Sequence, residues 1–299
     1  MTTATRWQDV AEKGSLLGIR IIVALATVLG RRTVRAVLHV VAARYVAFHP
    51  AVRRASRDYL VRLRGRASLG DVHRHVLCFA RVTADRIFLA RGAFGKFAVT
   101  TEGEGYLRAL RDERRGALIL LAHLGSFEVL RAVGGAHDVP VSVLGYFRNA
   151  RMVNAVLREL NPAIDARLIE IRPDDPTFIF DVERRISEGE LIGTMGDRVG
   201  ADGKSVRVPF LGASASFPTG PYLLAAALGC PVYLAFGLFH DPNRYALYCE
   251  PFAERVVLPR AGRTEALAAY AARFAARVEH HCRLAPYNWF NFYDFWSAE

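Results

Sequence analysis

The chain has 299 residues, of which 52% are hydrophobic and 11% aromatic, and this predicts a large core and excludes extensive disorder. Its four cysteines include no CxxC pair, so we expect no disulfide framework. The formal net charge of +11 lies mainly at the front, since residues 1–75 hold 14 Lys or Arg against 4 Asp or Glu. A basic segment suits an anionic membrane or a nucleic acid. No zinc-finger, RNA-binding or helix-turn-helix pattern favours nucleic acid, which leaves the membrane as the better interpretation.

The most hydrophobic segment near the start spans residues 14–30, and Arg20 interrupts it. The apolar stretch that remains is about half the 20 or so residues that a bilayer-spanning helix needs. No small-residue cleavage site follows, so a signal peptide is not indicated. Residues 33–44 and 52–66 then show apolar positions at helical spacing with arginines between them, a pattern typical of helices in the headgroup layer. We expect residues 1–95 to be a helical, membrane-associating extension; a true membrane span and simple intramolecular packing are the alternatives.

From residue 96 onward, aliphatic runs alternate with segments of helical periodicity. Strands are predicted at residues 97–101, 117–122, 139–144, 166–171, 191–195, 206–210, 231–239 and 246–250. Helices are predicted at residues 106–115, 127–134, 150–160, 177–188, 219–228 and 264–283, and a further amphipathic helix at residues 73–95 ends the extension before them. This alternation predicts an α/β fold for residues 96–299, with a mostly parallel or mixed central sheet flanked by helices.

A histidine and a glutamate stand where one predicted strand passes into a helix. His123 follows the aliphatic run 117–122, and Glu128 lies five positions later, in the first helical turn. Active sites of α/β sheets lie at the C-terminal edge of the strands. A carboxylate that accepts from one ring nitrogen leaves the other free to take a proton from a hydroxyl. Gly125 allows a tight turn and Ser126 suits an N-cap. The alternative is a packed histidine beside a glutamate favoured by the helix dipole.

Other chemical motifs in the sequence are incomplete. The run at 203–205 resembles the end of a phosphate-binding loop, but Arg198 stands where that loop requires glycine. His280 and Cys282 flank a second histidine within one predicted helix, where adjacent side chains point apart, so this is a poor metal site. We therefore expect no metal and no bound cofactor.

Together these features resemble the lysophospholipid acyltransferase superfamily. His123 and Glu128 match its first motif, in the glutamate form used by the bacterial late acyltransferases of lipid A. Residues 7–20, 53–60 and 286–296 resemble a peripheral branch of predicted acyltransferases, so the likeness spans nearly the whole chain. The resemblance implies transfer of an acyl group from acyl-carrier protein or acyl-coenzyme A to a hydroxyl of a lipid or glycolipid. It also implies a peripheral or monotopic place on the cytoplasmic face of the bacterial inner membrane.

Carried over to this sequence, the resemblance makes His123 the general base and Glu128 its orienting partner. The first motif and three further blocks supply the substrate-binding positions that it implies: Gly125, Ser126, Arg148, Asn149, Asp197, Arg198, Thr219 and Gly220.

The expected mechanism is a one-step transfer in which backbone amides of residues 125–127 help to stabilise the oxyanion. Two other classes remain open. A lipid thioesterase or hydrolase would use Ser126 as nucleophile, and a non-catalytic lipid-binding membrane protein would need only the basic helices.

For the aromatic segment 286–296 we favour a core plug over an interfacial anchor or an acyl pocket.

Overall fold

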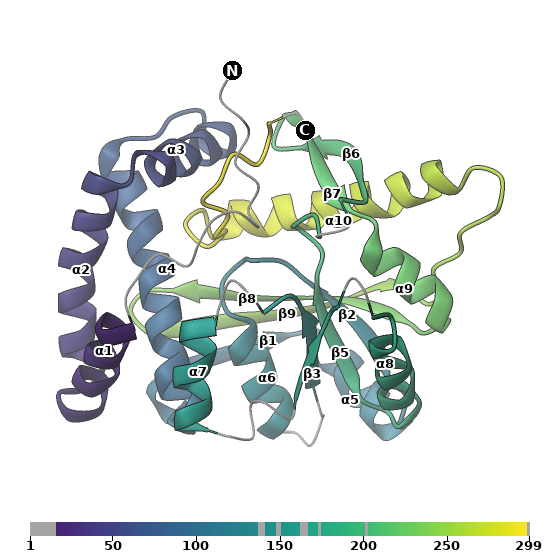
Figure 1. Ribbon diagram of the computed structural model, residues 1–299, viewed down its shortest axis with the longest axis horizontal. Coiled ribbons are helices and arrows are strands. Elements are labelled where there is room, and N and C mark those ends of the chain that lie inside the picture. Colours follow the sequence, from purple (N-terminus) through teal and green to yellow (C-terminus); the bar gives the residue numbers. More distant parts are fainter. Residues whose placement is uncertain are drawn as a thin grey trace.

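The computed structural model describes residues 16–136, 141–147, 151–161, 167–172, 175–200 and 203–297. Its centre is a seven-stranded sheet with the strand order β1-β9-β8-β2-β5-β3-β4 (Figure 1). The strands are β1 (Ala98–Glu102), β2 (Ala117–Leu121), β3 (Val141–Gly145), β4 (Leu168–Glu170), β5 (Leu191–Met195), β8 (Val232–His240) and β9 (Arg244–Ala253). Neighbouring strands pair in parallel except β8 and β9, which pair antiparallel. The predicted α/β class is therefore confirmed.

Helices cover the sheet on both faces. They are α5 (Glu104–Asp112), α6 (Phe127–Ala136), α7 (Arg151–Leu160), α8 (Phe178–Ser187), α9 (Gly220–Leu228) and α10 (Arg263–Leu284). In β2, Leu118 and Leu120 belong to the buried cluster that includes residues of α9 and α10. Ile119 and Leu121 point to the other side and belong to the cluster that includes residues of α5 and α6. Alternate residues of a strand point to opposite faces, so a strand between two helical layers needs an unbroken aliphatic run. This run leads the chain directly into the turn that carries His123.

In the described part of the chain, four helices precede the sheet: α1 (Leu16–Val28), α2 (Gly30–Phe48), α3 (Pro50–Arg64) and α4 (Leu69–Ala90). Gly65 ends α3 in the left-handed conformation, at φ +77°. Ser68 and Asp71 form a capping box that begins α4. The helical extension is therefore present as predicted. None of the helices in the described ranges combines the length and the apolar character that crossing a bilayer requires.

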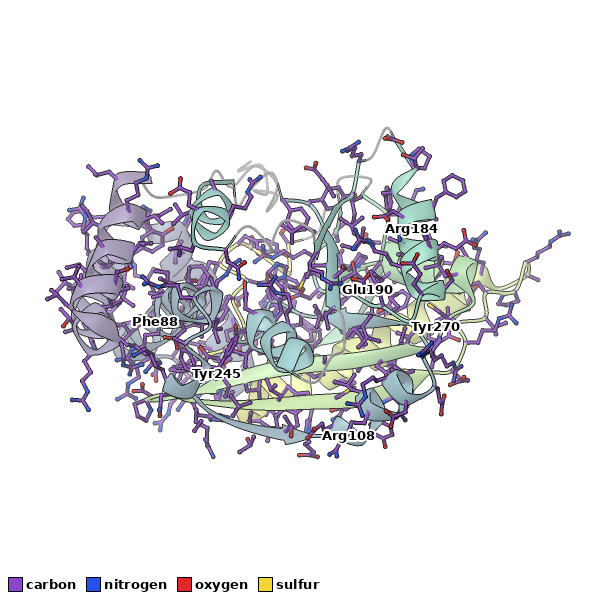
Figure 2. The ribbon with its side chains drawn as sticks, turned by 90° about the horizontal axis from the view of Figure 1, so that it is seen from below. Phe88, Arg108, Arg184, Glu190, Tyr245 and Tyr270 are labelled. Carbon is purple, nitrogen blue, oxygen red and sulfur yellow. The ribbon has the colours of Figure 1, made fainter. Side chains whose placement is uncertain are left out.

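The inner faces of these helices share a core with the sheet. Phe88 of α4 and Tyr245 of β9 belong to one buried cluster, and they lie close together in Figure 2. The buried carboxylate of Asp85 accepts two hydrogen bonds from Arg31, at 2.7 and 2.8 Å, and one from the Tyr245 hydroxyl at 2.9 Å. Removing one partner of such a buried ion pair costs about 3–5 kcal/mol. Intramolecular packing thus accounts for the inner faces of α2 and α4.

A hairpin of β6 (Ser205–Phe210) and β7 (Ala213–Pro218) lies outside the main sheet, over α10 (Figure 1). The first strand was predicted from the sequence, whereas the second was not, because its alanines and serines have weak β propensity. Leu211 and Gly212 form the two-residue turn with φ of +51° and +78°. The amide of Leu211 donates to Glu279 of α10 at 2.7 Å, which holds the turn against the helix.

Candidate active site

His123 stands two residues beyond the end of β2. The amide of Gly196 donates to the Leu121 carbonyl at 2.8 Å, so the ladder between β2 and β5 continues to the edge of the sheet. The chain then turns sharply, with the Leu124 amide 2.6 Å from the Ala122 carbonyl oxygen. The His123 side chain keeps 27% of its surface exposed. The imidazole is therefore where the sequence predicted it, at the C-terminal edge of parallel strands and accessible to a substrate.

The carboxylate that holds this imidazole is Asp197. His123 Nδ1 donates to Asp197 Oδ1 at 2.8 Å, and the backbone amide of His123 donates to Oδ2 at 3.0 Å. Asp197 follows β5 and is fully buried, and it reaches His123 because β5 pairs in register beside β2. Since a carboxylate accepts from Nδ1, the proton of the neutral ring resides there and Nε2 is left as the proton acceptor.

Glu128 faces elsewhere, and the prediction that it orients His123 is wrong. Its carboxylate forms an ion pair with Arg86 of α4 and accepts from the Ser126 hydroxyl at 3.2 Å. The reason is the position of the helix start: α6 begins at Phe127, so the first turn directs Glu128 toward α4 rather than back to the strand end. The five-residue spacing fixed the distance along the chain but not the direction of the side chain.

The turn after His123 depends on Gly125, which has φ +70°. Its amide donates to the Asn288 carbonyl at 2.9 Å, and a Cβ built there would lie 1.9 Å from the Gly237 oxygen. The next amide, from Ser126, donates to that same Gly237 oxygen at 2.8 Å. Both amides thus already donate hydrogen bonds to backbone carbonyls of the protein. Of the three amides expected to stabilise the oxyanion, those of Gly125 and Ser126 are therefore not available, because the turn pairs with β8 and the C-terminal segment instead. A contribution from the Phe127 amide stays a prediction.

The C-terminal segment holds the dyad from the other side. The Trp289 indole donates to Asp197 Oδ2 at 3.2 Å, and Asn291 Nδ2 donates to the same oxygen at 2.9 Å. The amide of Phe290 donates to the His123 carbonyl at 2.7 Å. Trp289 is fully buried and contacts other aromatic rings, so the prediction of a core plug is confirmed. Trp289 and Asn291 were not predicted to belong to the site, although an asparagine in an aromatic run is a signal for a buried hydrogen bond.

Arg198 links this segment to the dyad. Its Nε donates to Asn291 Oδ1 at 2.6 Å, and its Nη2 donates to the Phe290 carbonyl at 2.9 Å. Burial alone would raise the pKa of Asp197, but the charge and hydrogen bond of His123, with Arg198 and Asn291, lower it to about 2. Burial lowers the pKa of His123, and the positive charge of Arg198 lowers it further against the opposing effect of Asp197. A charged Asp197 beside a neutral imidazole is the state that a general base requires.

The remaining predicted site residues take different places. Thr219 and Gly220 lie at the start of α9, where the Thr219 amide donates to the Lys204 carbonyl at 3.1 Å. Ser126 is 1% exposed, which makes it a poor nucleophile for an incoming thioester. Arg148 and Asn149, predicted to bind the acceptor, fall outside the described residues.

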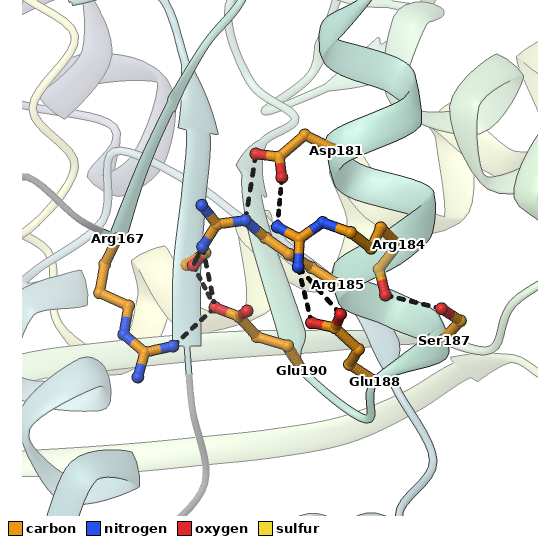
Figure 3. A network of polar contacts seen from close by, with 8 residues as sticks. Arg167, Asp181, Arg184, Arg185, Ser187, Glu188 and Glu190 are labelled. Atoms are coloured by element: carbon orange, nitrogen blue, oxygen red, sulfur yellow. Dashed lines mark hydrogen bonds and ion pairs between the residues drawn. The ribbon is translucent and has the colours of Figure 1, made fainter.

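A second polar cluster lies at the opposite end of the strands. Figure 3 shows Glu190, which immediately precedes β5, between Arg167 and Arg185, with Arg167 donating to it at 2.9 Å. Arg185 also donates to Ser142 of β3 at 2.9 Å and to Asp181 at 3.1 Å. The carboxylates in this cluster are paired with guanidinium groups, which stay protonated at any physiological pH. This cluster therefore fastens α8 to the sheet and offers no proton acceptor comparable to His123.

Comparison with known families adds to this geometry. Residues 91–297 match the family model described as bacterial lipid A biosynthesis acyltransferase. The matched range contains His123, Asp197 and the C-terminal segment that holds them. No curated protein matches the chain.

Proposed function

This chain belongs to the bacterial lipid A biosynthesis acyltransferase family, and from that premise we propose that it transfers a fatty acyl group to a hydroxyl of a membrane lipid or glycolipid. The donor in this proposal is a thioester, either acyl-carrier protein or acyl-coenzyme A. The observation that carries the proposal is the accessible imidazole of His123, whose Nδ1 is tied to the buried carboxylate of Asp197 at 2.8 Å.

The proposed reaction is a direct transfer. The acceptor hydroxyl oxygen attacks the thioester carbonyl carbon while His123 Nε2 takes its proton. The carbon–sulfur bond then breaks, and the thiolate leaves with the proton returned from the imidazolium, so that an ester and a thiol are formed. Asp197 stays ionised throughout and stabilises the imidazolium. The buried position of Ser126 supports this route over an acyl-enzyme intermediate.

We further propose that the outer faces of α1 and α2 lie on an anionic membrane, as a peripheral or monotopic attachment at the cytoplasmic face of the inner membrane. Large apolar side chains are exposed on these helices: Leu17, Ile21, Val28, Val40, Val41 and Phe48. Exposed arginines accompany them, and Arg44 stacks over the Phe48 ring at 5.3 Å. Apolar side chains with interspersed cations suit a helix lying in the headgroup layer.

The test is transfer by the purified protein in vesicles that contain candidate hydroxyl lipids, with acyl-carrier protein and coenzyme A thioesters supplied separately. The proposal predicts a lipid product heavier by one acyl group, found by mass spectrometry, and no acyl adduct on the protein. Release of free fatty acid with an adduct on Ser126 would identify a hydrolase instead. Absence of both products with every donor and acceptor would contradict the proposal.

A further inference from the structure

We propose that the outer face of α3 is the docking surface for an acidic acyl-carrier protein, which presents its thioester to His123. This inference rests on the proposed function and selects the carrier protein as donor. Arg54 and Arg57 are the two side chains that mark the surface. They are three residues apart, which places them side by side on one face of the helix.

The charge of α3 is unbalanced. Its 15 residues contain five arginines and one aspartate. The arginines already engaged by protein groups are Arg53, Arg62 and Arg64. Arg54 and Arg57 are exposed, and neither makes a hydrogen bond or an ion pair within the described residues. Two adjacent cations without an internal partner are available to an anionic one.

The opposite face of α3 lies against the candidate active site. Tyr59 is fully buried there, and its ring is 5.0 Å from the ring of Trp289. The Trp289 indole donates to Asp197, the partner of His123. Figure 1 shows α3 beside the yellow C-terminal segment. A helix with its side chains is about 10 Å wide, so one helix and the Trp289 ring separate Arg54 and Arg57 from the dyad. The proposal requires the flexible prosthetic arm of a docked carrier to pass around this buried layer to His123.

Side-chain composition favours a protein over a lipid surface on this face. Among the described residues, the large hydrophobic side chain that α3 exposes is Val61, at 39%. By contrast, Val28 on α1 is 78% exposed and Val40 on α2 is 70% exposed. Insertion into a headgroup layer needs apolar side chains, whereas recognition of an acidic protein depends on charge complementarity. The two neighbouring surfaces thus divide into a lipid-facing pair, α1 and α2, and a cationic helix for the carrier.

The test compares two charge reversals at opposite ends of the molecule. Arg54→Glu/Arg57→Glu changes the proposed surface. Arg260→Glu/Arg263→Glu makes the same charge change near the start of α10, at residues that are also exposed. Arg54→Ala/Arg57→Ala is a milder second variant in case the reversal disturbs folding, which thermal unfolding would detect. Binding of purified acyl-carrier protein is measured by calorimetry, independently of catalysis.

We expect the α3 reversal to raise the Kd for acyl-carrier protein, and the KM for its thioester, by about tenfold or more with little change in kcat. Transfer from an acyl-pantetheine thioester, which lacks the protein, should be unchanged in all variants. Equal losses in the α3 and α10 variants, or unchanged carrier binding in both, would overturn the inference. So would loss of binding to anionic vesicles by the α3 variant while carrier binding is retained. If wild-type protein binds the carrier through α3 but transfers no acyl group, the proposed function fails and the docking surface stands.

Discussion

Asp197 accepts hydrogen bonds from both the imidazole Nδ1 and the backbone amide of His123, at 2.8 and 3.0 Å. Two bonds to one carboxylate fix both the ring and the turn that carries it. The two residues come from the ends of β2 and β5, which are neighbours in the sheet although more than 70 residues apart in the chain. The orientation of the His123 ring thus follows from the order of the strands in the sheet.

Asp197→Asn should abolish most of the transfer while Glu128→Gln does not. The amide in Asp197→Asn no longer selects the tautomer with a free Nε2, so we expect kcat to fall by about 10²–10⁴-fold. Glu128 pairs with Arg86, so Glu128→Gln should mainly lower the free energy of unfolding. Steady-state rates and thermal unfolding of both variants check this. Equal losses of kcat would show that Glu128 takes part in the chemistry.

The pH dependence of kcat/KM should show a base with a pKa below 6.5, the ordinary value for histidine. The imidazole accepts a proton only when neutral, so activity should rise with pH through the lowered pKa of His123. Because the positive charge of Arg198 contributes to that lowering, Arg198→Gln should move the midpoint to higher pH. Arg255→Gln, an exposed arginine on another part of the surface, is the control. A wild-type midpoint above 6.5, or one that Arg198→Gln leaves in place, would contradict the assignment.

Gly125→Ala should disrupt the turn after His123 far more than the same change at Gly92. Both glycines have φ near +70°, so both variants carry backbone strain of about 1–2 kcal/mol. At Gly92 the new methyl group meets nothing within 4 Å, whereas at Gly125 it would meet the Gly237 oxygen. We expect Gly125→Ala to lose both stability and turnover. Equal unfolding temperatures for the two variants would count against this packing.

Acid should destabilise the protein through His75, which is buried and bonded to the C-terminal segment of the site. Its ring donates to the Trp289 carbonyl and accepts from Ser56, both at 2.8 Å. Burial lowers the pKa of His75 to about 4, although the bond to Trp289 opposes this. Between pH 6.5 and 4 the unfolded state therefore binds a proton that the folded state does not, so stability falls as pH falls.

Over that range the loss from His75 should amount to about 3 kcal/mol. His75→Gln keeps a donor and an acceptor without titrating, and it should flatten the dependence of the unfolding free energy on pH. The buried His281, whose pKa is also lowered to about 4, is present in both proteins, so their difference isolates His75. Parallel pH curves for wild type and His75→Gln would refute this role.

Local pattern was enough to predict the α/β class and the position of His123, because aliphatic runs mark strands and the imidazole directly follows one. Asp197 was predicted only as a substrate-binding position that the family resemblance implies. Its partnership with His123 was not predicted, since the pairing of β2 with β5 is set by the whole sheet. Glu128 was nearer in sequence, and the direction of its side chain depended on where α6 begins. The contacts of Trp289 and Asn291 likewise required the fold of the C-terminal segment.

The rate of acyl transfer by His123→Ala, measured beside wild type with the same thioester and lipid acceptor, is the most direct test of the proposed mechanism. Unfolding curves should first establish that the variant is folded. We predict that the variant loses the contribution of a positioned base, about 10²–10⁴-fold or more in kcat, at every pH. Turnover close to that of wild type with each candidate donor would contradict the role of His123 as the general base.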